Sequence, residues 1–119
     1  MLDIRRGDVW MVEFPFGEGI GSKPRPAVVV QCDEDNRRLG TVLAAMVTSK
    51  TDRVGRERRH VVIEFDTEVG KSAGLWRDSV INCTQLGAIK KELFFRRLGE
   101  LSDPLMDEVS NVLRSVLTL

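Results

Sequence analysis

The chain has 119 residues, and its 18 basic and 18 acidic side chains cancel, so net charge gives no sign of a nucleic-acid or membrane binder. This length suits one domain, residues 1–119, with a substantial core. Charged residues interrupt the N-terminus and no apolar run reaches membrane-spanning length, which argues against a secretory signal or a membrane partner. We therefore expect a cytoplasmic protein.

Short alternating and β-branched runs predict a mainly β domain. The first run places Trp10, Val12 and Phe14 on one face, and the fourth does the same with Val61, Ile63 and Phe65. Polar or glycine-rich segments at 15–22, 33–40, 50–59 and 66–74 are expected to be turns or loops. The predicted strands cover residues 6–14, 27–31, 41–47, 60–65, 79–84 with 86–89 as a continuation, and 93–98 as an edge strand bearing Arg96 and Arg97.

The end of the chain changes to a helical period. Asp103 is predicted as the N-cap and Pro104 as the first helical residue. Apolar residues then follow on one face, namely Leu105, Val109, Val112, Leu113, Val116 and Leu117. Five or six short strands followed by this helix predict a small barrel or strongly curled sheet that the helix closes.

Arg25 stands between Pro24 and Pro26, directly before an apolar run. Proline cannot donate to a strand ladder, so the two prolines are expected to mark the start of the strand and keep it extended. If residues 27–31 and 41–47 pair as a hairpin, Arg25 and Thr48 meet at one edge of the sheet. A guanidinium beside a hydroxyl suits a phosphodiester, and a purely structural ion pair of Arg25 is the alternative.

Charge is unevenly distributed along the chain. Residues 50–59 hold five basic side chains against two acidic ones, whereas residues 100–119 hold four acidic ones against Arg114 alone. The basic stretch begins where the expected pocket lies. The cations expected to contact a nucleic-acid backbone are Lys23, Lys50, Arg53, Arg56, Arg58 and Arg59.

Several other chemistries lack the residues they need. One histidine, no CxxC pair and no clustered carboxylates argue against a metal site, and no glycine-rich phosphate loop precedes a helix. No serine lies in a nucleophile-elbow pattern. Cys32 and Cys83 each lie in an apolar run and are expected to be buried, reduced thiols. No cofactor is expected.

Five segments are similar, in order and spacing, to the MazF/PemK family of bacterial toxin endoribonucleases. They are RGDVW at 6–10, RPAVVV at 25–30, AMVT at 45–48, DSVI at 78–81 leading to Gln85, and LGELS at 98–102. The resemblance implies a small SH3-like curled barrel, mainly β with α, of five to seven strands capped by a C-terminal helix. It also implies a homodimer that cleaves single-stranded RNA without a metal and is neutralised by a small MazE-like antitoxin.

The resemblance places the catalytic pair at Arg25 and Thr48, and Ser49 could replace Thr48 if the strand ends one residue later. Ser49, His60 and Gln85 are the possible supporting residues. The ribose 2′-hydroxyl would attack the adjacent phosphorus, giving a cyclic phosphate and a free 5′-hydroxyl. Guanidinium groups keep their proton in proteins, so Arg25 is expected to stabilise charge first and to transfer protons second. His60 could shuttle a proton, or could simply begin its strand.

Two other functions use the same fold. One is a gyrase poison of the CcdB type, which the final segment Val116-Leu117-Thr118-Leu119 disfavours because it lacks tryptophan. The other is a catalytically silent binding module, against which the presence of both Arg25 and Thr48 argues.

Overall fold

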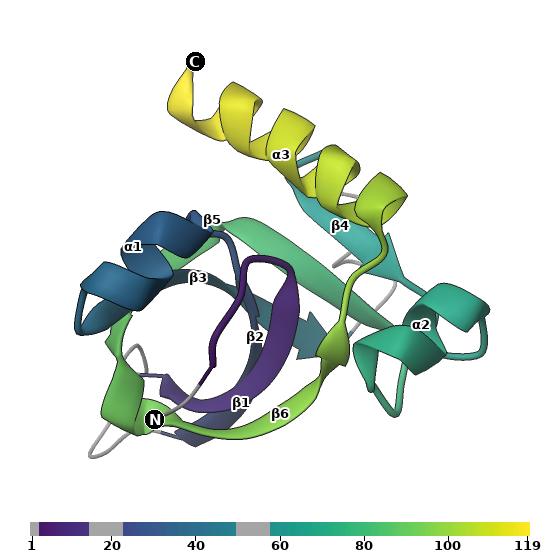
Figure 1. Cartoon of the computed structure of the whole chain (residues 1–119). Helices are drawn as coiled ribbons and strands as arrows, with labels where there is room; N and C mark the ends of the chain where they lie inside the picture. The colour runs from purple at the N-terminus through teal and green to yellow at the C-terminus, as the bar shows by residue number, and fades with distance from the viewer. Residues whose placement is uncertain (1–2, 15–22, 50–57) are drawn as a thin grey trace.

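In a computed structural model of the chain, residues 3–14, 23–49 and 58–119 are described. Within them, six antiparallel strands form one sheet in the order β4-β5-β3-β2-β1-β6, which curls round on itself (Figure 1). The strands are β1 (Asp8–Phe14), β2 (Lys23–Val29), β3 (Thr41–Ser49), β4 (His60–Ile63), β5 (Ser79–Lys90) and β6 (Phe94–Glu100). The helices are α1 (Asp33–Arg38), α2 (Glu68–Ala73), the short 3₁₀ turn η1 (Lys91–Leu93) and α3 (Asp103–Leu117).

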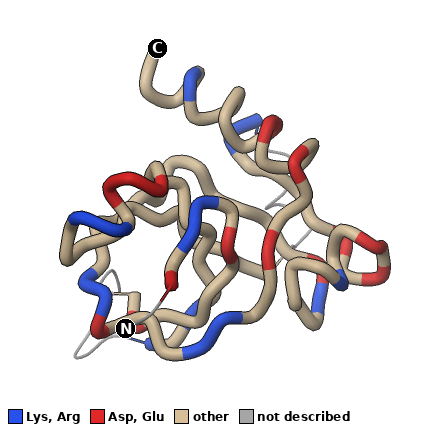
Figure 2. Tube along the Cα trace, viewed as in Figure 1, with Lys and Arg blue, Asp and Glu red and all other residues tan. Residues whose placement is uncertain are grey.

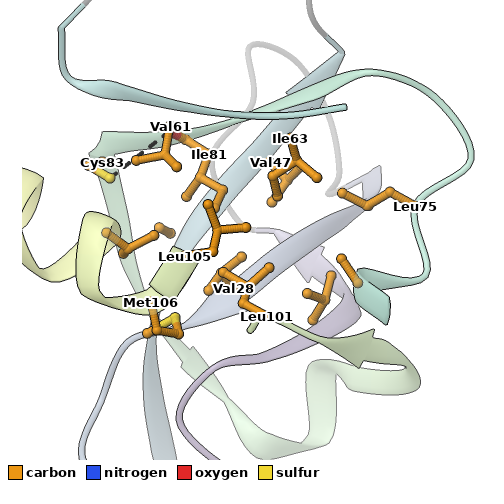
Figure 3. Close-up of a cluster of buried hydrophobic side chains, with 14 residues drawn as sticks. Val28, Val47, Val61, Ile63, Leu75, Ile81, Cys83, Leu101, Leu105 and Met106 are labelled. Carbon is orange, nitrogen blue, oxygen red and sulfur yellow. Dashed lines mark hydrogen bonds between the residues drawn. The ribbon is translucent and has the colours of Figure 1, made fainter. Parts of the chain in front are cut away.

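The curled sheet has an apolar core on each face. Strict alternation along β1 puts Trp10, Val12 and Phe14 in the core of the concave face, as the sequence predicts. The ring of Trp10 meets that of Phe94 edge-to-face, with centroids 6.0 Å apart. The core of the outer face lies under α3 and beside α2 (Figures 1 and 3), and it includes Val28, Val47, Val61, Ile63, Ile81, Cys83, Leu105 and Met106.

Two segments expected to be turns contain short helices instead. In α1, the acidic side chains lie in the first turn and the basic ones in the last turn, which complements the helix dipole. Its buried Asn36 donates to the carbonyl oxygen of Gln31 at 3.0 Å and so fixes the helix against the end of β2. In α2, the Thr67 hydroxyl accepts from the Gly70 N–H, and Gly74 ends the helix at a φ of 74°.

Strand boundaries differ from the expected ones throughout the sheet, most clearly in β2, β4 and β5. β2 begins at Lys23, so both prolines lie inside it, and it ends at Val29. β4 ends at Ile63, which leaves Phe65 outside the sheet and 42% exposed. β5 is continuous, but its pairing to β3 jumps between Ala45 and Met46, where residues 83–85 form a bulge. The expected edge strand is confirmed as β6, which pairs only with β1 among the described strands.

The C-terminal helix α3 begins one residue earlier than expected. Ser102 is the N-cap, since its hydroxyl accepts from the Leu105 N–H, and Asp103 is already helical. Acidic residues lie on the first half of α3 and Arg114 lies near its end (Figure 2). Leu105, Met106 and Val109 are buried against the sheet. The helix therefore covers the outer face of the sheet, as the sequence predicts. No helix in the described ranges is long and apolar enough to span a membrane.

The two cysteines lie in different environments. Cys83 is fully buried in the outer core, whereas Cys32 is exposed at the start of α1, contrary to the expectation for both. The physical reason is that Cys32 lies beyond the end of β2, where the chain leaves the sheet and turns into α1. Burial raises the pKa of the Cys83 thiol to about 11, and the negative charge of Glu108 adds to the shift.

Gly99→Ala tests the contact between α2 and β6. A Cβ at Gly99 would lie 2.1 Å from the Ser72 carbonyl oxygen, so the helix would have to move away from the strand. We expect a loss of about 1–3 kcal/mol in the free energy of unfolding, measured in urea at one protein concentration. Gly40→Ala is the control, because nothing lies within 4 Å of its added Cβ. Equal effects of the two substitutions would contradict this packing.

The Cys83 thiol predicts a pH dependence of stability. An unfolded cysteine loses its proton near pH 8.5, whereas folded Cys83 keeps it to about 11. Above about pH 8.5 the unfolded state therefore binds fewer protons than the folded state. The contribution of the Cys83 thiol to the free energy of unfolding is complete at lower pH and is lost as the pH rises toward 11. We expect the stability difference between wild type and Cys83→Ala to shrink from pH 7 to pH 10.5 in urea unfolding. A difference that stays constant would show that burial does not hold the thiol neutral.

Candidate functional site

The pairing of β2 with β3 stops at Ala27 and Met46, and the two prolines explain why. The N–H of Val30 donates to the carbonyl oxygen of Leu43 on β3, so every second residue before Val30 also turns its backbone toward β3. Pro26 and Pro24 occupy those positions and have no N–H to donate. β2 remains paired to β1 as far as Lys23, so the strand continues. The edge of β2 that faces β3 is unpaired in this part of the strand.

A concave pocket of about 210 Å³ lies where β2 and β3 separate. Residues from the start of β2 form one side, and residues from the end of β3 form another. The segment between α2 and β5 forms the third. The lining residues are Pro24, Arg25, Pro26, Val47, Thr48, Ser49, Leu75, Trp76, Arg77 and Ser79.

Arg25 and Thr48 both line this pocket. Continuing the β2–β3 register by two residues places Arg25 opposite Thr48. Alternation puts both on the concave face of the sheet, the face to which Ala27 and Met46 contribute core side chains. Arg25 is exposed and Thr48 is half-buried. The hairpin inference from sequence is therefore confirmed in its geometry, since both residues line one pocket.

Arg25 has no carboxylate partner among the described residues. The pocket lining therefore combines a guanidinium without such a partner with the Thr48 hydroxyl on the same face of the sheet and the Ser49 hydroxyl on the opposite face of β3, which gives positive charge and hydrogen-bond donors. This kind of site favours an oxyanion, because several donors can converge on one anionic group. The structural ion pair considered as an alternative role for Arg25 is not seen in the described part of the chain.

The sequence did not predict the third side of the pocket. Arg77 donates to the Ser49 hydroxyl at 3.1 Å, so a second guanidinium faces the end of β3. The indole of Trp76 is 53% exposed beside it. Both residues lie between α2 and β5, and they reach the pocket because Ser79 pairs with Ser49 at the start of β5. The sequence feature that could have pointed to this side of the pocket is a tryptophan next to an arginine, shortly before a predicted strand.

The other predicted site residues that fall in the described ranges lie outside the pocket lining. Lys23 begins β2 and is exposed, two residues before Arg25. Arg58 is exposed, and Arg59 accepts the Cys83 N–H through its carbonyl oxygen at 3.1 Å. His60 begins β4 opposite Asn82, and Gln85 lies in the bulge of β5, where it accepts from the Asn82 amide. Lys50, Arg53 and Arg56 fall outside the described residues.

The described residues bring together no group of three histidine, cysteine or acidic side chains that could hold a metal ion. The charged groups at the pocket are instead the two guanidinium groups, Arg25 and Arg77. The chemistry that this set of residues can perform is the binding of an anion and the stabilisation of negative charge that develops on it.

Comparisons with known proteins show the family. Residues 5–117 match the family model described as the PemK-like, MazF-like toxin of type II toxin–antitoxin system. Two relatives are each 35% identical to this chain over 120 residues: the endoribonuclease MazF2 of Mycobacterium bovis and the endoribonuclease MazF6 of Mycobacterium tuberculosis. Each match covers 98% of this chain and 98% of the relative. The chain therefore belongs to the PemK-like, MazF-like family of type II toxins.

Solved structures confirm the fold expected from sequence. MazF from Deinococcus radiodurans matches with a TM-score of 0.75 and 21% identity, covering 100% of both chains. A MazE–MazF structure from the same organism matches with a TM-score of 0.75 and 21% identity, over 99% of each chain. The mainly β, curled sheet with a C-terminal helix is thus the MazF-like fold.

Proposed function

We propose that this chain is a toxin that cleaves single-stranded RNA at short sequences, without a metal, through the pocket that holds Arg25 and Thr48. One observation carries the proposal: Arg25, Thr48 and Ser49 line one pocket where β2 and β3 separate. Arg25 is exposed there and has no carboxylate partner in the described ranges. Relatives named as endoribonucleases at 35% identity support the choice of RNA. The cytoplasm, where such a substrate is found, would be its site of action.

The reaction is an internal transfer of the phosphoryl group. The ribose 2′-oxygen loses its proton and bonds to the adjacent phosphorus, while the bond from phosphorus to the 5′-oxygen breaks. The departing 5′-oxygen takes up a proton, so the products are a 2′,3′-cyclic phosphate and a 5′-hydroxyl. The nucleophile belongs to the substrate, so DNA, which lacks the 2′-hydroxyl, cannot react this way.

Arg25 and Thr48 act on the charge that grows on the phosphoryl oxygens. The planar guanidinium of Arg25 donates two parallel hydrogen bonds to them, and the Thr48 hydroxyl donates a third. The neighbouring Ser49 supplies a further hydroxyl and is held by Arg77. Guanidinium groups hold their proton tightly in proteins in general, so Arg25 would serve mainly as an electrostatic clamp. His60 and Gln85 remain supporting candidates that would act from beyond the pocket lining.

Basic side chains outside the pocket would guide the RNA backbone. Lys23 lies next to the pocket on β2, and Arg58 and Arg59 lead into β4. Lys50, Arg53 and Arg56 belong to the same basic stretch of sequence. Their charges act over several ångströms and weaken with salt, so they would contribute to affinity for any single strand rather than to the choice of cut site.

Loss of either donor is expected to slow cleavage. Arg25→Ala and Thr48→Ala should each lower the rate on a long single-stranded RNA in EDTA by about 10²–10³, because a developing negative charge loses a placed donor. Arg25→Lys should restore only part of the rate, since an ammonium lacks the planar fork. Thr41→Ala and Arg114→Ala are matched controls on exposed positions outside the pocket. Full activity of Arg25→Ala in a folded protein would contradict the proposed site.

The proposed partners are a second copy of this chain and a MazE-like antitoxin. A MazE–MazF structure is known for the Deinococcus radiodurans relative. Exposed apolar side chains at Phe95 and Leu117 give this chain surface that a partner could cover. An acidic antitoxin segment would compete with RNA for the basic side chains.

Light scattering and titration at several salt concentrations test both partners. We expect the mass of two chains for the protein alone and a larger complex when the antitoxin is added. Joint substitution Arg58→Ala and Arg59→Ala should weaken the antitoxin affinity and reduce its dependence on salt, because two charge contacts are removed. The mass of one chain would contradict the homodimer, and an unchanged salt dependence would contradict the electrostatic contact.

A further inference from the structure

Trp76 is a large apolar side chain that the fold leaves uncovered at the proposed site. It is 53% exposed and lines the pocket that also holds Arg25. Tryptophan gains much from burial, so an indole held at a polar pocket needs a reason. Phe65 and Phe95 are comparably exposed aromatic side chains, but neither lines this pocket. The position of Trp76 is therefore more informative than its exposure alone.

The backbone on both sides of Trp76 is fixed by the fold. Before it, Leu75 is buried in the outer core, and Gly74 lies so close to the Leu98 carbonyl oxygen that a Cβ would be 2.0 Å away. After it, the Asp78 carboxylate accepts the Phe65 N–H at 3.1 Å, and the Ser79 hydroxyl donates to the Arg77 carbonyl oxygen at 2.9 Å. An aromatic ring on such a segment is presented in place before a ligand arrives.

Arg77 next to it carries unused donors. Its guanidinium gives one N–H to the Ser49 hydroxyl and pairs with no carboxylate among the described residues. The bond to Ser49 directs the guanidinium toward the end of β3. Two adjacent residues thus offer a flat apolar face and a cation to the same concave space.

We propose that Trp76 and Arg77 form a nucleotide subsite beside the scissile phosphate, in which the indole stacks on an unpaired base and the guanidinium binds a flanking phosphate. The inference rests on the proposed cleavage of RNA and names two residues that select and position the strand. A nucleotide has an aromatic base and an anionic phosphate linked by one sugar, which matches an indole and a guanidinium on consecutive residues. Trp76 acts as a specificity-determining residue, and Arg77 acts as a positioning residue.

Binding that is measured without cleavage tests the subsite. The probe is a labelled single-stranded RNA that contains the sequence cut by wild type, with a 2′-O-methyl ribose at the cut so that no attack can occur. Trp76→Ala should weaken binding about ten-fold, and Trp76→Phe should restore most of it, because a stacking face returns. Phe65→Ala, which removes a comparably exposed ring outside the pocket, should change nothing.

A scan with single abasic nucleotides identifies the stacked base. At one position near the cut, removal of the base should lower the affinity of wild type about ten-fold. The same removal should not change the affinity of Trp76→Ala, which has already lost the stacking contact. Arg77→Gln should weaken binding to all sequences and lower the salt slope by about one, whereas Arg114→Gln, which loses a similar bond to Asn111, should not.

The outcomes separate this inference from the proposed function. If wild type cuts RNA but Trp76→Ala binds the probe as tightly as wild type does, the subsite alone is overturned. The same holds if removal of a base lowers the affinity of both proteins equally at every position. Loss of antitoxin binding without loss of RNA binding in Trp76→Ala would also overturn it, in favour of a protein contact. Absence of any cutting or RNA binding by folded wild type would overturn the subsite and the proposed function together.

Discussion

Two missing backbone donors shape the proposed site. Pro24 and Pro26 turn toward β3 but cannot donate, so the β2–β3 ladder ends at Ala27 while β2 stays paired to β1. The strands separate there without either one losing its other neighbour, because β3 remains paired to β5 as far as Ser49. An opening made in this way has walls of regular strand on both sides. Side chains at its rim therefore have fixed directions, which a site that stabilises a transition state needs.

The third wall depends on packing far from the pocket. The close approach of Gly99 on β6 to Ser72 lets α2 lie against the edge strand, and the left-handed Gly74 then turns the chain back toward β5. Arg77 follows three residues later and reaches Ser49. The site thus combines a local device, the prolines, with a long-range one, the docking of a short helix. A change at either place would alter the spacing of the two guanidinium groups.

The sequence was enough to predict the part of the site that two consecutive strands form. Consecutive strands pair by default, so the hairpin pattern alone predicts that Arg25 and Thr48 meet. Trp76 and Arg77 could not be placed in this way, because they reach the pocket through the pairing of β5 with β3, strands separated by β4 and α2. The short helices α1 and α2 were missed for a related reason. Each is six residues long, below the length at which an apolar period shows, and only caps and charge order mark them.

The proposed mechanism predicts a specific chemistry at the cut. The most direct measurement is the identity of the new ends when purified protein acts on a single-stranded RNA in EDTA, beside the same strand with one 2′-deoxyribose at the cut. If Arg25 and Thr48 assist attack by the ribose, the fragments will carry a 2′,3′-cyclic phosphate and a 5′-hydroxyl, and the substituted strand will stay intact. Equal cutting of the substituted strand, or a reaction that EDTA stops, would contradict the proposed mechanism.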